Sequence, residues 1–351
     1  NMRKLYYLVM ISVASILTAC ENRSEEWDVV DFGNDCAVGL QEHLECRFIP
    51  LETKDSVLLK DLYRVCWVDD RIFVFDRSDE INALFVFSDQ GNFITRVGLR
   101  GQGPKEYLYL THFFVDEKER ILTLVDFGGT ALLRYDLDTY QYISTQDVAD
   151  YFVDCAPLDK ENWIWYYPLG FATPQRENFY LKATDRKGEQ DALLGSAYFT
   201  SGHTINGSKT LHAFAGDWYA HFPFTPEVWK VKDGRDFSGD LFRSGYVNSF
   251  GLLETERILH ATYMCDKVTY FGFYDKDRKE AFSYAFPNFI RATGLTGFYG
   301  ICGVYKDYFI GKISSTVLLR NQIHYEDLRR IAENRTQDDN PILCLFKIER
   351  S

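Results

Sequence analysis

The chain has 351 residues and a formal net charge of −12 at pH 7. This acidity argues against a nucleic-acid binder, because backbone phosphates would repel the chain at long range. Aromatic residues make up 16% of the sequence, with 28 Phe and 23 Tyr. That composition favours β-strands, and amphipathic helical runs are scarce.

The first segment, residues 1–20, has the features of an export signal. Two basic residues precede an apolar run from Leu5 to Ile16, which is followed by Leu17-Thr18-Ala19-Cys20. The run has about a dozen residues, whereas a membrane-spanning helix needs roughly 20. The Leu-Thr-Ala-Cys ending resembles the bacterial lipobox, in which the cysteine is acylated. We therefore expect Cys20 to carry lipid that anchors the chain to the outer membrane, on its periplasmic face or at the cell surface; plain secretion is the alternative.

Residues 21–43 follow the signal and begin with a polar, acidic stretch. This composition predicts a flexible tether between the lipid and the folded domain. An acidic stretch after the lipidated cysteine also resembles a surface-export signal, and the sequence leaves open whether it is one or simply a soluble linker.

Cysteines show neither CxxC nor Cys/His zinc spacing, although the chain contains eight of them. Several lie inside apolar runs, such as Cys66 and Cys302, and we interpret them as buried free thiols that pack like small hydrophobic side chains. The one pair that we would test for a disulfide is Cys36 and Cys46.

An internal repeat organises the rest of the chain. Residues 62–97 and 112–145 align as two units with a period of about 49 residues, each with four short strand-like runs separated by turns. Degenerate copies follow at 151–194, 211–242 and 252–286. A sixth copy, starting at Gly297, is interrupted at 323–333 by apolar residues at helical spacing and ends with a strand at 342–348.

The sixth unit has three strands, and Cys46 to Leu51 ahead of the first unit supplies a fourth. Joining an N-terminal strand to the last unit closes a ring and removes exposed sheet edges. The sequence therefore predicts an all-β six-bladed β-propeller of four-stranded antiparallel blades over residues 44–351. A two-domain β protein is the alternative.

Two further segments carry a family resemblance. Gly98 to Tyr107, followed by Phe114-Val115-Asp116, looks like the Gly-x-Gly-Pro-x-Glu-Phe/Tyr signature between the blades of NHL-repeat propellers. The whole chain resembles the six-bladed β-propeller lipoproteins of Bacteroides-type bacteria, including the opening Ile49 to Thr53 and the ending Asn340 to Phe346. Lys105 departs from the usual Gly, and the third to fifth blades match poorly. The resemblance implies the fold and leaves the chemistry open.

Candidate sites are few. Gly101 to Pro104 lacks the strand, turn and helix order of a phosphate-binding loop, and we interpret it as a turn that needs positive φ at glycine. Three histidines at nine-residue intervals could converge on a metal, or be structural. Four aspartates at strand ends could bind calcium or act as a base, or cap turns. These residues are His203, His212, His221, and Asp76, Asp116, Asp126, Asp136.

Aromatic residues in the third unit form a further candidate. Trp163, Trp165 and Tyr167 alternate along one strand and so share a face, which could stack against a sugar ring or pack in the core.

Two classes of function stay open. The leading prediction is a binding protein without catalysis, displayed by lipid on the cell envelope, that recognises a glycan, a peptide or an envelope protein. This prediction implies no cofactor and assigns no catalytic residue. The alternative is a metal-dependent hydrolase or lyase of the lactonase kind, with calcium or zinc held by residues that converge on the ring axis.

Overall fold

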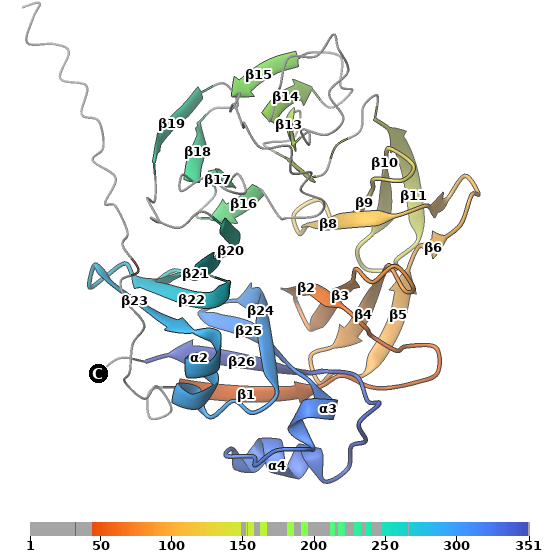
Figure 1. Ribbon diagram of the computed structural model, residues 1–351. Coiled ribbons are helices and arrows are strands. Elements are labelled where there is room, and N and C mark those ends of the chain that lie inside the picture. Colours follow the sequence, from red (N-terminus) through yellow and green to blue (C-terminus); the bar gives the residue numbers. More distant parts are fainter. Residues whose placement is uncertain are drawn as a thin grey trace, which may run out of the picture.

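The repeating pattern of short apolar runs and polar turns folds into antiparallel sheets. The computed structural model describes residues 32 and 152 and the ranges 44–148, 154–157, 162–166, 181–185, 191–195, 211–214, 217–221, 228–232, 236–240, 248–265 and 267–349. Within these residues the strands form six four-stranded sheets and one two-stranded sheet. The six larger sheets are arranged as blades in a ring (Figure 1), which confirms the predicted propeller.

The first three blades follow one another along the chain. Blade 1 contains β2 (Leu62–Val68), β3 (Arg71–Asp76), β4 (Ala83–Ser88) and β5 (Phe93–Val97). Blade 2 contains β8 (Leu110–Asp116), β9 (Ile121–Asp126), β10 (Ala131–Asp136) and β11 (Tyr142–Asp147). Blade 3 contains β12 (Asp154–Pro157), β13 (Asn162–Tyr166), β14 (Leu181–Asp185) and β15 (Asp191–Gly195).

The other three blades complete the ring. Blade 4 contains β16 (Leu211–Phe214), β17 (Asp217–His221), β18 (Val228–Lys232) and β19 (Asp236–Asp240). Blade 5 contains β20 (Asn248–Glu254), β21 (Ile258–Cys265), β22 (Val268–Asp275) and β23 (Glu280–Ala285). Blade 6 contains β24 (Phe298–Tyr305), β25 (Tyr308–Ile313), β26 (Ile342–Ile348) and β1 (Leu44–Pro50).

The first strand of each blade is its innermost strand. β24 lies beside β2 and β20, and β12 lies beside β8 and β16, so the six first strands meet around the ring axis. Figure 1 shows these strands nearest the middle of the ring, with β5, β11 and β19 at its rim.

Blade 6 closes the ring with strands from both ends of the chain. β1 pairs antiparallel with β26 along its whole length, from Leu44 opposite Ile348 to Pro50 opposite Ile342. This pairing confirms the predicted closure. Because β1 covers the outer edge of β26, that edge offers no unpaired backbone groups to another chain.

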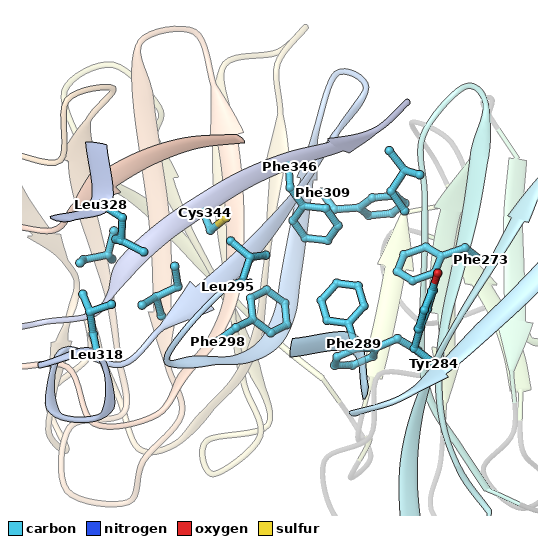
Figure 2. Close-up of a cluster of buried hydrophobic side chains, with 14 of the residues drawn as sticks. Phe273, Tyr284, Phe289, Leu295, Phe298, Phe309, Leu318, Leu328, Cys344 and Phe346 are labelled. Carbon is cyan, nitrogen blue, oxygen red and sulfur yellow. The ribbon is translucent and has the colours of Figure 1, made fainter. Parts of the chain in front are cut away.

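The blades pack face to face through large apolar side chains, most densely between blades 5 and 6. Phe273 of blade 5 contacts Phe309 of blade 6, and Phe289 contacts both Phe273 and Phe346 (Figure 2). Alternation along each strand sends neighbouring residues to opposite faces, so a blade between two others is apolar on both. This explains why the strands appear in the sequence as continuous apolar runs.

Three helices lie in the part of the chain that the structure describes. α4 (Glu326–Ala332) falls within the helix predicted at 323–333. α2 (Phe286–Thr293) and α3 (Ser315–Leu318) were not predicted. α2 has a proline in its first turn and ends at Gly294 with φ of 69°, both ordinary helix-boundary signals. None of the described helices has the length and hydropathy of a membrane span.

The glycine-rich segment between blades 1 and 2 is held by one carboxylate. β6 (Leu99–Arg100) pairs with β7 (Glu106–Tyr107), and the Glu106 carboxylate accepts a hydrogen bond from the Gly103 amide at 2.9 Å. A Cβ on Gly101 would lie 1.9 Å from that carboxylate, whereas the positive φ of 70° occurs at Gly98. Gly101 thus leaves room for the Glu106 carboxylate, and the prediction of positive φ in this turn is wrong, because neither Gly101 nor Gly103 has it.

Candidate functional site

Trp163 and Trp165, which were predicted to share a face that could stack against a sugar ring, are part of the core. Trp163 and Trp165 are 6% and 3% exposed, and their rings stack on each other at 5.7 Å. Phe114 of blade 2 contacts Trp163, and Phe152 contacts Trp165. A sugar ring needs an open aromatic face, and this packing leaves neither indole with one. Tyr167 lies outside the described residues.

The predicted histidine cluster is described only in its backbone. His203 lies outside the described residues. His212 pairs with Tyr219 between β16 and β17, and His221 is the last residue of β17. Among the residues whose side chains are described, no group of three His, Cys, Asp or Glu side chains could hold a metal ion.

The four aspartates at strand ends cap turns. Asp76 accepts hydrogen bonds from the Lys60, Asp61 and Ser78 amides, and its side chain is fully buried. The carboxylates of the other three aspartates also accept hydrogen bonds from backbone amides. Asp126 accepts from the amides of Leu108 and Tyr109, Asp136 from those of Asp138 and Thr139, and Asp116 from those of Lys118 and Glu119.

The described cysteines are free thiols. Burial raises the pKa of the Cys302 thiol to about 12, so it stays protonated at neutral pH and is a poor nucleophile. Cys46, proposed as a disulfide partner of Cys36, has its sulfur hydrogen-bonded to Cys344 on the neighbouring strand and to Tyr325. Cys36 lies outside the described residues.

A group that sequence analysis missed lies where the inner strands of blades 6, 1 and 2 begin. We call it the inner-end cluster. Four members lie on the inner strands β2, β8 and β24, which are nearest the middle of the ring in Figure 1, whereas Lys312 lies in β25 and Arg77 directly follows β3. The cluster consists of Tyr63, Arg64, Arg77, His112, Tyr299 and Lys312.

Tyr299 and Lys312 form the blade 6 part of this cluster. The Lys312 ammonium lies 4.6 Å from the centre of the Tyr299 ring and donates a hydrogen bond to the Leu62 carbonyl of blade 1 at 2.8 Å. The Tyr299 side chain is 38% exposed. Among the described residues it is the single aromatic residue with such exposure. Partial desolvation of its hydroxyl, together with the nearby Asp61 and Asp76, raises the pKa of Tyr299 above its ordinary value.

A bulge turns Tyr299 out of the blade. The register between β24 and β25 shifts between Phe298 and Gly300, which leaves Tyr299 without a partner residue in the ladder. The φ angle of Gly300 is 153°. A bulge leaves one residue unpaired and re-aims its side chain. The Tyr-Gly pair inside an apolar strand is the sequence signal that could have located this residue.

Arg64 and Arg77 form the blade 1 part of the cluster. The Arg64 guanidinium lies 4.9 Å from the Phe113 ring of blade 2 and donates to the Phe113 carbonyl at 3.0 Å. It also contacts both ring nitrogens of His112, 2.8 Å from Nδ1. The Arg77 guanidinium stacks 3.7 Å from the Tyr63 ring. Three cationic side chains, Arg64, Arg77 and Lys312, thus lie in the cluster, together with the nearby carboxylates of Asp61 and Asp76.

Comparisons with known proteins agree with the architecture. The profile of the DUF5128 family, described as a six-bladed β-propeller, matches residues 17–235 and 230–312. A search of curated proteins found no match.

Two solved structures share the fold. A protein from Bacteroides fragilis, described as exported, superposes with a TM-score of 0.81 at 22% identity over 92% of this chain and 100% of its own. A member of the DUF4221 family from Bacteroides vulgatus superposes with a TM-score of 0.58 at 10% identity over 89% and 100%. At these identities the likeness concerns the fold alone. Because the DUF5128 profile spans most of the sequence, the chain belongs to the DUF5128 family of six-bladed β-propellers.

Proposed function

We propose that the chain is an exported, lipid-anchored binding protein that acts without catalysis, and that its ligand contacts the inner-end cluster. The observation that carries the proposal is Tyr299, 38% exposed on the inner strand β24, with the Lys312 ammonium over its ring. The exported relative from Bacteroides fragilis and the lipobox-like Leu17 to Cys20 support the location in the cell envelope.

An oligosaccharide with an acidic sugar fits this pair best among the ligand classes expected from the sequence. The C–H face of a pyranose packs against an exposed aromatic ring. Lysine has three N–H donors, of which the Leu62 carbonyl takes one. The ammonium is therefore placed to bind a carboxylate on a sugar that covers Tyr299.

The first experiment is a thermal-shift screen of the chain with neutral and uronic-acid oligosaccharides, calcium, zinc and EDTA. A ligand that binds the folded state raises the Tm. We expect an acidic oligosaccharide to raise the Tm and EDTA to leave it unchanged. Stabilisation by metal that EDTA reverses would instead support the metal-dependent hydrolase or lyase.

Titration calorimetry of variants then locates the site. We expect Tyr299→Ala to weaken binding of the acidic oligosaccharide at least tenfold, equivalent to about 1.4 kcal/mol, and Lys312→Met to weaken it for acidic sugars alone. Lys347→Met on the neighbouring β26 is the control and should bind as the wild type does. Equal affinity of wild type and Tyr299→Ala, with an unchanged Tm, would contradict the proposed site.

A further inference from the structure

Phe32 is a residue of the predicted tether, yet it lies buried against blade 5. Its side chain is 2% exposed, and its ring stacks on Tyr263 with 5.8 Å between centroids and 28° between planes. Leu252, Leu259 and Ala261 belong to the same apolar cluster. A phenylalanine twelve residues before β1 is therefore part of the core of the propeller.

The surface that receives Phe32 is hollowed by small side chains. Ala261 of β21 lies opposite Gly272 of β22, which lies opposite Ser283 of β23. Larger pairs flank this row on the same face, with Tyr263 opposite Tyr270 on one side. A Cβ on Gly272 would lie 2.5 Å from a ring carbon of Phe32. The absence of a side chain at Gly272 makes the room that the ring occupies.

Phe32 lies on the face of blade 5 that points away from blade 6. Phe273 and Phe282, on the opposite face, pack in the core shared with blade 6. Residues opposite each other in a ladder share a face, and Gly272 is adjacent to Phe273, so it points the other way. The ring of Phe32 therefore occupies the side of blade 5 that faces blade 4.

We propose that Phe32 is a plug that fixes the N-terminal segment to blade 5, so that the propeller is held at the membrane through this blade and not through β1. The membrane part rests on the proposed lipid anchor at Cys20. Phe32 lies twelve positions after Cys20, which limits the reach of the chain between them to about 40 Å, whereas the 24 positions to Leu44 would allow about 80 Å.

A double-mutant cycle tests the plug without reference to lipid. Gly272 has φ outside the left-handed region, so alanine there is opposed by the Phe32 ring and not by the backbone. We expect Gly272→Ala to lower the Tm by several degrees in the wild type. In a Phe32→Ala background the same change should leave the Tm equal or raise it, because glycine to alanine in a strand is otherwise favourable.

Gly251→Ala is the matched control, because a Cβ at Gly251, in β20 of the same blade, meets no atom within 4 Å. It should have the same small effect in both backgrounds. A fall in Tm from Gly272→Ala that persists unchanged in Phe32→Ala would overturn the plug. Hydrogen exchange gives a second readout. Phe32→Ala should speed amide exchange in β21 and β22 and leave exchange in β3 unchanged. If the variant and the wild type exchange at the same rate in β21 and β22, the plug is also overturned.

The membrane part is tested with the lipidated chain in liposomes that carry a fluorescent lipid. A fluorescent unnatural amino acid at Glu280 of blade 5 should transfer energy to the bilayer more efficiently than one at Lys118 of blade 2, and Phe32→Ala should reduce the difference. Equal transfer in the wild type would overturn the proposed attachment. A mature chain without lipid mass would refute the anchor while the double-mutant cycle still decides the plug.

Discussion

The contact between blades 5 and 6 and the contact between blades 1 and 2 solve the same packing problem differently. Between blades 5 and 6 the contact is rich in aromatic side chains: Phe273 and Phe309 lie against the buried imidazole of His260, and Phe346 contacts Phe309. Between blades 1 and 2 an apolar core is also present, built on Phe73 and Phe113.

Blades 1 and 2 add an ionic network at the turns. Arg71 and Arg120 both contact Asp138, and each also contacts Asp69. The apolar contacts between blades 5 and 6 should therefore contribute most of the free energy of unfolding. The ion pairs between blades 1 and 2 should fix how these two blades align and contribute little to that free energy. The following changes test that difference.

The largest effect is expected at Phe273. Its side chain is fully buried, and its ring contacts Phe282 at 5.4 Å and Phe289 at 5.9 Å. Phe273→Ala removes these contacts and leaves a cavity, so we expect a loss of about 3–5 kcal/mol in the free energy of unfolding, measured by urea titration. Val268→Ala at the exposed start of the same strand should cost less than about 0.5 kcal/mol. Similar losses for both would contradict the account of this contact.

A pH dependence is expected from His260. Burial lowers the pKa of His260 to about 3, although the Gly272 carbonyl accepts a hydrogen bond from its Nδ1 at 3.0 Å. The unfolded chain binds this proton near pH 6.5, so stability falls as the pH drops from 6.5 towards 3, by about 2 kcal/mol at pH 5.

Urea titrations of the wild type and His260→Gln between pH 7 and pH 4 measure this dependence. The difference in stability between pH 7 and pH 5 should be smaller in the variant. Glu254, whose pKa burial raises to about 7, is present in both proteins and cancels in the comparison. Parallel pH profiles would show that His260 does not titrate as described.

The smallest effects are expected in the network between blades 1 and 2. Arg71 is 14% exposed and donates to the Leu137 carbonyl at 2.9 Å and the Tyr140 hydroxyl at 3.1 Å. Arg71→Ala should cost about 1–2 kcal/mol, through these hydrogen bonds more than through charge. Arg120→Ala should cost less, because the Arg120 side chain is more exposed than that of Arg71 and its ion pairs are screened by salt.

Salt separates the two contributions. Raising the ionic strength from 0.05 to about 0.5 M should shrink the effect of Arg120→Ala and leave that of Phe273→Ala unchanged. A salt-insensitive Arg120 variant as damaging as Phe273→Ala would show that the ion pairs, and not the aromatic side chains, hold the blades together.

Local pattern explains what could be predicted from the sequence. Blades 1 and 2 are meanders of short strands joined by tight turns, so the repeat over residues 62–97 and 112–145 could be predicted. The closing strand, predicted at Cys46 to Leu51, is found at Leu44–Pro50. The helix near 326 was predicted from its apolar spacing, whereas α2 was missed because a strand and a helix follow each other without a turn between Ala285 and Phe286.

The candidate site could not be predicted, because it depends on contacts far apart in the sequence. Lys312 reaches the Leu62 carbonyl across 250 positions, and Phe32 meets Gly272 from a segment that looks like a tether. Trp163 and Trp165 alternate as a binding strip would, but alternation cannot distinguish a face open to solvent from one covered by the next blade. Only the packing of whole blades separates these cases.

The most direct test of the proposed function is a crystal structure of the chain with the acidic oligosaccharide that raises its Tm most. The account predicts one sugar ring against Tyr299 and its carboxylate within hydrogen-bonding distance of the Lys312 Nζ. A sugar bound at the rim of the blades, away from the inner-end cluster, would contradict it.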